Sequence, residues 1–190
     1  MVYVVGRWNT IVSFNLCYSD DPRGIEKIIP NIVLQGVYDQ TYSDRAYLVK
    51  SLEGDLLMVR RFLGYHRRED GYSYSSGTES FEVYKLQLDV QSGKLLQMSK
   101  VNSLGDNVLF LDDSDSISLS ASYFSNCLQK DSIYYADDFY DDHPTPYPSS
   151  PFDNGIYNVK DQSFAKHYPY DSSFERMPPP LWVLPPFKWD

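Results

Sequence analysis

The sequence predicts an all-β protein, and three observations support this expectation. Short apolar runs recur about every ten residues along the chain, and many of them alternate with polar residues. Clusters of Gly, Asp, Asn and Ser separate these runs, which is the composition of tight turns. Aromatic residues make up 16% of the chain, with 17 Tyr and 10 Phe, and these residue types favour strands.

The stretch SFEVYKLQLDVQSGKLL at residues 80–96 shows the pattern most clearly. Tyr84, Leu86 and Leu88 fall on one side of a period-two register, and the polar residues between them fall on the other. A Ser-Gly pair follows at residues 92–93, where a short hairpin loop needs a positive φ. The stretch therefore predicts a β-hairpin with one buried and one solvated face.

The same reasoning, taken in chain order, predicts about 13 strands and no amphipathic helix. They are expected at residues 2–5, 10–16, 32–37, 46–52, 55–63, 81–90, 94–101, 108–111, 117–121, 132–136, 155–159, 163–167 and 181–184. Such a series is typical of a sandwich, a barrel or a propeller. Residues 117–121 alternate whereas residues 108–111 are apolar throughout, and this mixture favours the stacked sheets of a propeller. No domain boundary is predicted within residues 1–190.

The net charge of −9 argues against a nucleic-acid partner, because such a field repels phosphate. One basic cluster stands against this background, at Arg60, Arg61, His66, Arg67 and Arg68. Acidic residues follow it at once, so we interpret it as a strand end with its solvated loop.

Only Cys17 and Cys127 are present, and their wide separation predicts a reducing compartment, the cytoplasm or the nucleus. Cys127 is expected to be a packed thiol rather than a nucleophile. No apolar run has the length of a membrane helix, and no basic region precedes the first apolar run as in a signal peptide. No membrane partner is therefore expected.

Candidate chemical motifs each have a simpler structural interpretation. The acidic stretch at residues 112–116 could bind a cation, but it lacks the glycine and distant glutamate of a calcium loop and fits a hairpin turn. The carboxylate pairs at residues 137–138 and 141–142 lack the contrasting environments that acid–base catalysis needs. No nucleophile elbow, phosphate loop or dinucleotide motif occurs. The sequence thus predicts no enzyme, no cofactor and no metal site.

Several segments match one family in order and spacing. They are YLVKSLEGDLLMVRRF at residues 47–62, FEVYKLQLDVQSGKLLQMSKVNSLGDNVLFL at 81–111, SISLSASYF and DSIYYADD within 116–138, and NGIYNVKDQSF and PPPLWVLPP beyond residue 153. Together they resemble the plant F-box-associated β-propeller family of the KIB type. One departure is Ser132, which stands where the family often has a cysteine.

This resemblance implies a partial β-propeller of about three four-stranded antiparallel blades, the C-terminal part of the family's propeller domain. No segment resembles the helical F-box with which such proteins usually begin. A partial ring leaves edge strands exposed, so we expect the isolated chain to be marginally stable or self-associating.

The implied function is non-enzymatic recognition of a protein substrate for an F-box ubiquitin ligase. Recognition is expected on two loops, residues 67–77 and 140–151, with Tyr72, Tyr74, Tyr140 and Tyr147 as candidate protein-binding residues. A Skp-type adaptor is an expected partner only if an F-box lies upstream. Two alternatives stay open: a truncated, non-functional remnant of such a receptor, or a propeller-type hydrolase.

Overall fold

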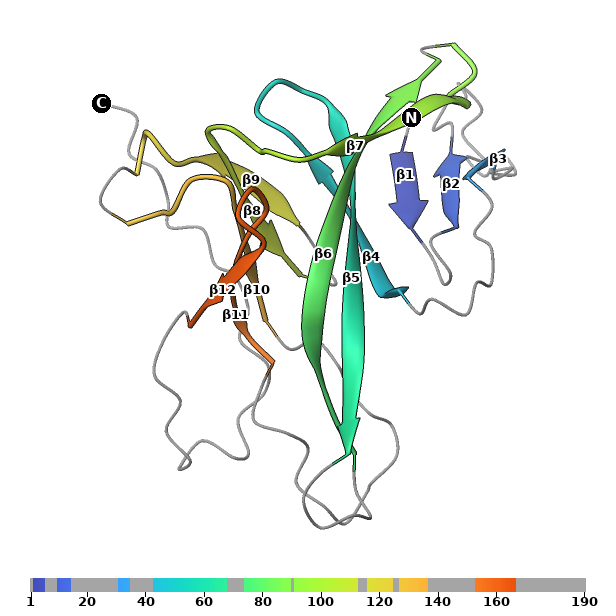
Figure 1. Ribbon diagram of the computed structural model, residues 1–190. Coiled ribbons are helices and arrows are strands. Elements are labelled where there is room, and N and C mark those ends of the chain that lie inside the picture. Colours follow the sequence, from blue (N-terminus) through green and yellow to red (C-terminus); the bar gives the residue numbers. More distant parts are fainter. Residues whose placement is uncertain are drawn as a thin grey trace, which may run out of the picture. The chain divides into compact units, whose positions relative to one another are not determined.

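The computed structural model describes residues 2–5, 10–14, 31–34, 43–67, 74–89, 91–112, 116–124, 127–136 and 153–166. All regular elements in these ranges are strands, β1 to β12 in chain order, which confirms the predicted all-β class (Figure 1). Among the same residues, no helix has the length and apolar character needed to span a membrane. The predicted strand at 181–184 lies outside the described residues.

The chain divides into two compact units, which we describe separately. The first unit comprises Met1–Gly64 and Thr78–Ser103, and the second comprises Tyr65–Gly77 and Leu104–Asp190.

The first unit contains two sheets, apart from residues 65–67 and 74–77 of the two longest strands, which are counted with the second unit. One has three antiparallel strands in the order β1-β2-β3, namely β1 (Val2–Val5), β2 (Ile11–Phe14) and β3 (Asn31–Leu34). The other has the order β4-β5-β6-β7, with β4 (Ser43–Lys50), β5 (Leu56–Arg67), β6 (Tyr74–Leu88) and β7 (Leu95–Val101). The ladders β4–β5 and β6–β7 are antiparallel, as expected for hairpins.

Glycines with positive φ close both of these hairpins. Gly54 has a φ of 90° between β4 and β5, where its N–H donates to the Ser51 carbonyl at 3.0 Å. Gly93 has a φ of 67° between β6 and β7, and its N–H donates to the Asp89 carbonyl at 2.8 Å. The first turn was predicted from Glu53-Gly54-Asp55 and the second from the Ser-Gly pair at residues 92–93. A residue with a Cβ would be strained at either glycine.

Both faces of the four-stranded sheet carry buried residues. On one face Met58 and Leu86 form a core cluster with Ile11 of β2, so this face packs against the three-stranded sheet. The predicted alternation is confirmed here, because Tyr84 and Leu88 join the cluster while Lys85 and Gln87 are exposed. The opposite face buries a second set of side chains that are at most 5% exposed: Tyr47, Val49, Leu57, Val59, Phe81 and Val83.

The predicted loop at residues 67–77 is shorter than expected. β5 extends to Arg67 and β6 begins at Tyr74, so the two longest strands lie side by side far beyond their apolar segments (Figure 1). The Tyr-Ser-Ser-Gly stretch at residues 74–77 belongs to β6 although its composition is typical of turns. Backbone hydrogen bonding in a sheet can outweigh such local preferences.

The second unit holds one five-stranded sheet in the order β12-β11-β10-β8-β9. Its strands are β8 (Asn107–Leu111), β9 (Ile117–Ser120), β10 (Ser132–Tyr135), β11 (Gly155–Asn158) and β12 (Ser163–Ala165). All its pairs are antiparallel except β8 and β10, which are parallel. The sequence suggested uniform antiparallel strands, and this central pair is the departure.

The central strands β8 and β10 are buried along their whole length, as the continuous apolar run at residues 108–111 indicated. Phe110 and Tyr134 stack across the parallel pair with ring centroids 4.7 Å apart. Val108 and Ala121 complete this second core cluster, and Ile117 and Leu119 of β9 pack against it.

Candidate functional site

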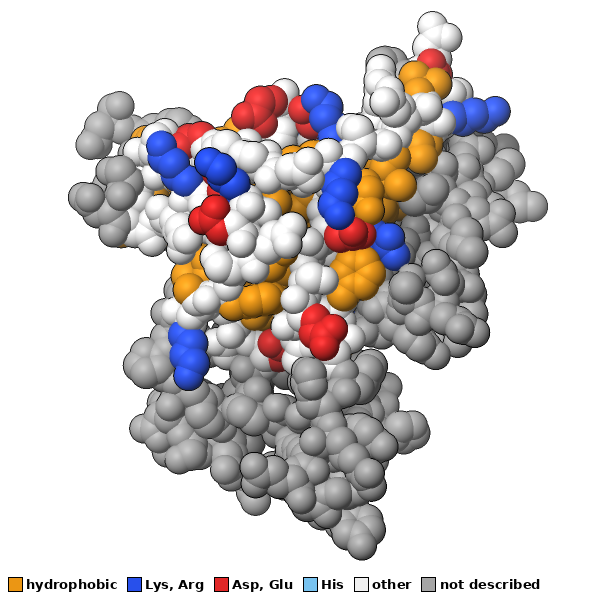
Figure 2. Space-filling model, in the orientation of Figure 1, with side chains coloured by type: hydrophobic (Ala, Val, Ile, Leu, Met, Phe, Trp, Pro, Cys, Tyr) orange, Lys and Arg blue, Asp and Glu red, His pale blue; other side chains and the backbone are white. Residues whose placement is uncertain are grey.

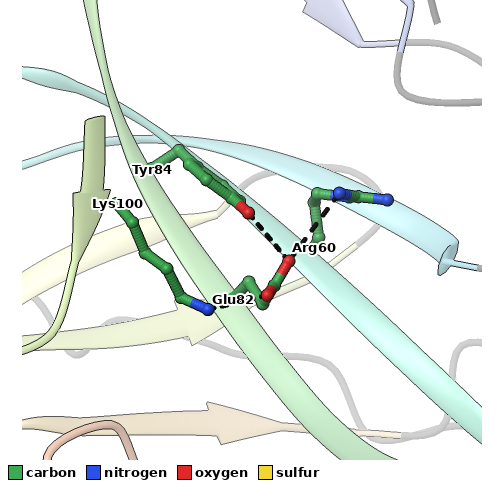
Figure 3. Close-up of polar contacts among 4 residues, drawn as sticks. All are labelled: Arg60, Glu82, Tyr84 and Lys100. Carbon is green, nitrogen blue, oxygen red and sulfur yellow. Dashed lines mark hydrogen bonds and ion pairs between the residues drawn. The ribbon is translucent and has the colours of Figure 1, made fainter. Parts of the chain in front are cut away.

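A cluster of four polar side chains spans three strands of the four-stranded sheet (Figure 3). Glu82 of β6 is at its centre, and we call Arg60, Glu82, Tyr84 and Lys100 the polar cluster. Lys100 Nζ of β7 donates to Glu82 Oε1 at 2.7 Å, and Tyr84 Oη donates to Glu82 Oε2 at 2.9 Å. Arg60 Nη1 of β5 lies 3.7 Å from Glu82 Oε2.

The strand registers explain why these residues meet. Glu82 and Tyr84 are two residues apart on β6 and therefore face the same side of the sheet. Tyr84 lies directly opposite Lys100, which places the lysine on that side as well. This is the face on which Leu86 and Met58 join the apolar core cluster.

The electrostatics of the polar cluster favour an ionised glutamate. Partial burial opposes ionisation of Glu82, but hydrogen bonds from Lys100 and Tyr84 and the positive charges of Lys100 and Arg60 outweigh it. The pKa of Glu82 is therefore below its ordinary value. Partial burial and the hydrogen bond to Glu82 raise the pKa of Tyr84. The phenol thus remains a proton donor to the carboxylate.

Besides its ion pair with Glu82, Arg60 contacts an aromatic ring. Its guanidinium carbon lies 5.0 Å from the ring centroid of Phe62, a cation–π arrangement. Its Nε atom is buried and has no hydrogen-bond partner among the described residues. Arg60 and Tyr84 are both partly exposed on the sheet, and these residue types often dominate protein–protein binding energy.

A second polar arrangement lies in the five-stranded sheet, around Asp106. Its carboxylate accepts hydrogen bonds from Ser120 Oγ at 2.6 Å, Ser122 Oγ at 2.8 Å and Ser122 N at 2.9 Å. These bonds hold the pKa of Asp106 below its ordinary value. A carboxylate stabilised in this way is a weak base, so the arrangement anchors the β9 turn and does not activate either serine.

Asp131 makes a comparable structural contact in the same unit. It has a φ of 57°, and its Oδ1 accepts hydrogen bonds from the backbone N–H groups of Leu104 and Gly105 at 2.6 and 2.9 Å. This contact connects the turn before β10 to the loop before β8.

The sequence-based candidates at the two loops are not tested by the structure. Tyr72, Tyr140 and Tyr147 lie outside the described residues. Tyr74 is the first residue of β6, and only its backbone is described. The prediction that these four tyrosines bind a partner therefore stays a prediction.

Two residues of the basic cluster lie in the strand that was predicted at residues 55–63, and this strand continues to Arg67. Arg60 and Arg61 are internal residues of β5, not part of a solvated loop. Arg61 is only 2% exposed, and it donates from Nη1 to Tyr47 Oη at 3.3 Å and from Nε to Thr78 Oγ1 at 2.8 Å. Buried hydrogen-bond acceptors on neighbouring strands make this burial possible.

Two further expectations have clear outcomes. Cys127 was expected to be packed, but it is exposed in a turn between β9 and β10. Ser116 Oγ donates to the Asp112 carbonyl at 3.1 Å, as in the hairpin turn expected at residues 112–116. Within the described part of the chain, no group of three or more His, Cys, Asp or Glu residues could hold a metal ion.

Exposed apolar side chains could also contribute to binding, and they were not singled out from the sequence. Tyr123 is 74% exposed, Leu96 62% and Met98 41%. On the face shown in Figure 2, hydrophobic side chains are interspersed with acidic and basic ones. Many protein contact sites are no more apolar than the rest of the surface, so this mixture does not by itself mark one.

The successive sheets and the family comparison together define a β-propeller protein, here a partial one. The family model described as the KIB1-4 beta-propeller matches residues 1–158, and the chain belongs to this family. The resemblance predicted from the sequence segments is thereby confirmed. No curated protein and no solved structure shows significant similarity to the chain.

Proposed function

We propose that this chain is the substrate-recognition propeller of a plant F-box ubiquitin-ligase receptor, acting in the cytoplasm or the nucleus. The observation that carries the proposal is the propeller-family match over residues 1–158. Propellers present side chains on a rigid scaffold, which suits the recognition of a protein partner. The proposed role is binding, without a chemical step on the substrate.

Within the described residues, the polar cluster is the contact site that we favour. Arg60, Tyr84 and Lys100 supply the aromatic and cationic groups that bind carboxylates and backbone carbonyls at interfaces. Lys100 is about half exposed, whereas Glu82 and Arg60 are about one quarter exposed. The cluster is therefore partly ordered before binding, which lowers the entropic cost of association. The tyrosines of the two loops, Tyr72, Tyr74, Tyr140 and Tyr147, would extend this site.

The proposal can be tested through the fate of the substrate. A propeller that binds its substrate without recruiting the ligase should protect that substrate from degradation. We expect the chain, produced in plant cells, to cause specific proteins to accumulate, and the same proteins should cross-link to it. Quantitative proteomics measures the accumulation, and photo-cross-linking from position 84 measures the contact.

A charge-reversal pair provides the control for the site. Lys100→Glu should weaken substrate binding by about tenfold and reduce accumulation, because it reverses a charge inside the cluster. Lys50→Glu makes the same change on an exposed residue of β4 and should leave both unchanged. Thermal melts must show that both variants fold. If no protein both cross-links and accumulates, the alternative of a non-functional remnant gains support.

The adaptor gives a second, independent test. We expect the 190-residue chain by itself not to bind a Skp-type adaptor, and we expect binding once an F-box is fused before Met1. Adaptor binding by the unfused chain would contradict the view that an F-box must be supplied from upstream.

A further inference from the structure

The outer strand of the four-stranded sheet is exposed over five consecutive residues. β7 is the last strand in the order β4-β5-β6-β7, so one of its edges pairs with no strand among the described residues. Leu96 to Lys100 are exposed, and half-buried Leu95 and Val101 bound the stretch on either side. Met98 is at the centre of this exposed stretch.

Two apolar side chains on this edge are exposed. Leu96 is 62% exposed and Met98 41% exposed. Met98 lies opposite Leu86 of β6, so its side chain is on the face that carries the core cluster and the polar cluster. The β6–β7 register pairs Gln87 with Gln97 and Leu88 with Leu95, so Leu96 is the extra residue of a bulge and the regular edge begins at Gln97.

We propose that this edge pairs with the same edge of a second copy of the chain. The two β7 strands would run antiparallel about a two-fold axis at Met98, extending two four-stranded sheets into one continuous sheet. An edge-to-edge contact of this kind is isologous, because each copy contributes the same residues. An unpaired strand edge is also the part of a sheet most prone to such pairing.

The side chains of the five residues complement one another in this register. Met98 faces Met98 of the second copy. Lys100 of the second copy lies opposite the bulge at Leu96, where its methylene stem can cover the exposed leucine. On the opposite side of the strand, Gln97 faces Ser99, and these two can hydrogen-bond across the pair.

Charge disfavours one competing register, the one with its axis at Lys100. Lys100 donates to Glu82 of its own chain at 2.7 Å, so its charge is balanced before any pairing. A two-fold axis at Met98 keeps the two Lys100 side chains at opposite ends of the paired stretch. An axis at Lys100 would place them directly opposite each other, which is destabilising. Because five residues per copy form a contact smaller than a standard interface of about 1,600 Å², the dimer should be weak and concentration-dependent.

Charge substitutions at the symmetry axis test the proposal in the full chain. Met98→Arg and Met98→Glu each place like charges face to face across the axis, and each should raise the dimer dissociation constant at least about tenfold. An equimolar mixture of the two variants should restore dimerisation, because Arg then faces Glu. Leu52→Arg introduces the same charge on a 48% exposed leucine in the β4–β5 turn and should dimerise like the unmodified chain.

Sedimentation velocity over a concentration series, with circular dichroism to check folding, measures all four proteins. A monomer–dimer equilibrium of the unmodified chain, its loss in each Met98 variant and its return in the mixture would support the contact. A chain that stays monomeric up to its solubility limit would overturn the proposal. A dimer or larger assembly that persists in Met98→Arg, or a mixture that fails to reassociate, would overturn it as well.

Discussion

The contact between the two sheets of the first unit makes a prediction that can be quantified. Ile11 of β2 is fully buried, and it belongs to one core cluster with Met58 and Leu86 of the four-stranded sheet. Ile11→Val removes one methylene and should lower the free energy of unfolding by about 0.5–1.5 kcal/mol. Met58→Ala removes a side chain that is only 1% exposed and should cost about 2–5 kcal/mol.

The informative quantity is the coupling between these two substitutions. Because both side chains line the same core, the cavity left by one changes the cost of the other. We expect a double-mutant cycle to give a coupling energy of about 0.5–3 kcal/mol. Urea unfolding followed by circular dichroism measures each variant, and a constant concentration of trimethylamine oxide keeps the least stable variant folded.

Ile133→Val is the matched control, because Ile133 is also fully buried but lies in the five-stranded sheet of the other unit. Combined with Met58→Ala, it should be additive to within about 0.5 kcal/mol. If Ile11 and Ile133 couple equally to Met58, or if Ile11 does not couple to Met58, the conclusion that the three-stranded sheet packs on the Met58 face is refuted.

Three further predictions test local features of the fold. The pKa of Glu82 is below its ordinary value of 4.5, so its ionised form contributes stability that is complete above pH 4.5 and is lost as the pH falls through the folded pKa. The unmodified chain should therefore be more stable than Glu82→Gln in urea unfolding, by an amount that shrinks below pH 4.5. A stability difference that stays the same at all pH values would contradict the contacts of the polar cluster. Gly155→Ala places a Cβ 2.9 Å from Tyr135 Oη and should lower the free energy of unfolding by about 1–3 kcal/mol. In a Tyr135→Phe background the same substitution should cost less, so the thermal melts with Gly155 and with Ala at this position should lie closer together. Asp131→Asn retains an acceptor and tolerates a φ of 57°, so its melting temperature should be close to that of the unmodified chain. Asp131→Ala should lower the free energy of unfolding by about 1–3 kcal/mol. Equal melting temperatures for the two variants would show that the carboxylate contact is dispensable.

Local features of the fold could be predicted from the sequence because their causes are local. The alternation of Tyr84, Leu86 and Leu88 against polar neighbours predicted the strand, and the Ser-Gly pair predicted the turn at Gly93. Twelve of the predicted strands match β1 to β12 in order, with differences at their ends. The largest such difference is at residues 74–77, where pairing in the sheet outweighs composition.

Pairing between distant segments could not be predicted in the same way. Nothing local to β8 or β10 shows that they lie parallel, because the connection through β9 decides it. Arg61 had the signature of a solvated residue, yet hydroxyl groups on two other segments make its burial possible. The polar cluster was missed for a similar reason. Glu82 and Tyr84 share a face by spacing alone, but Lys100 joins them only through the register of β7.

The segments that identify the family have structural roles wherever the structure describes their contacts. The Leu-Gly-Asp of residues 104–106 forms the loop that Asp131 and the β9 serines hold by hydrogen bonds. The Gly of residues 51–55 closes the β4–β5 turn. Arg60, Tyr84, Met98 and Lys100 lie in the same segments, so within them the turn residues hold the scaffold and the exposed side chains are available to partners. The resemblance fixes the scaffold, whereas partner choice must depend on exposed residues of the sheet face and the loops. Lys100→Glu and Met98→Arg test two such positions. Lys100 also lies on the β7 edge that is proposed to pair with a second copy, so substrate binding and sedimentation must both be measured for each variant.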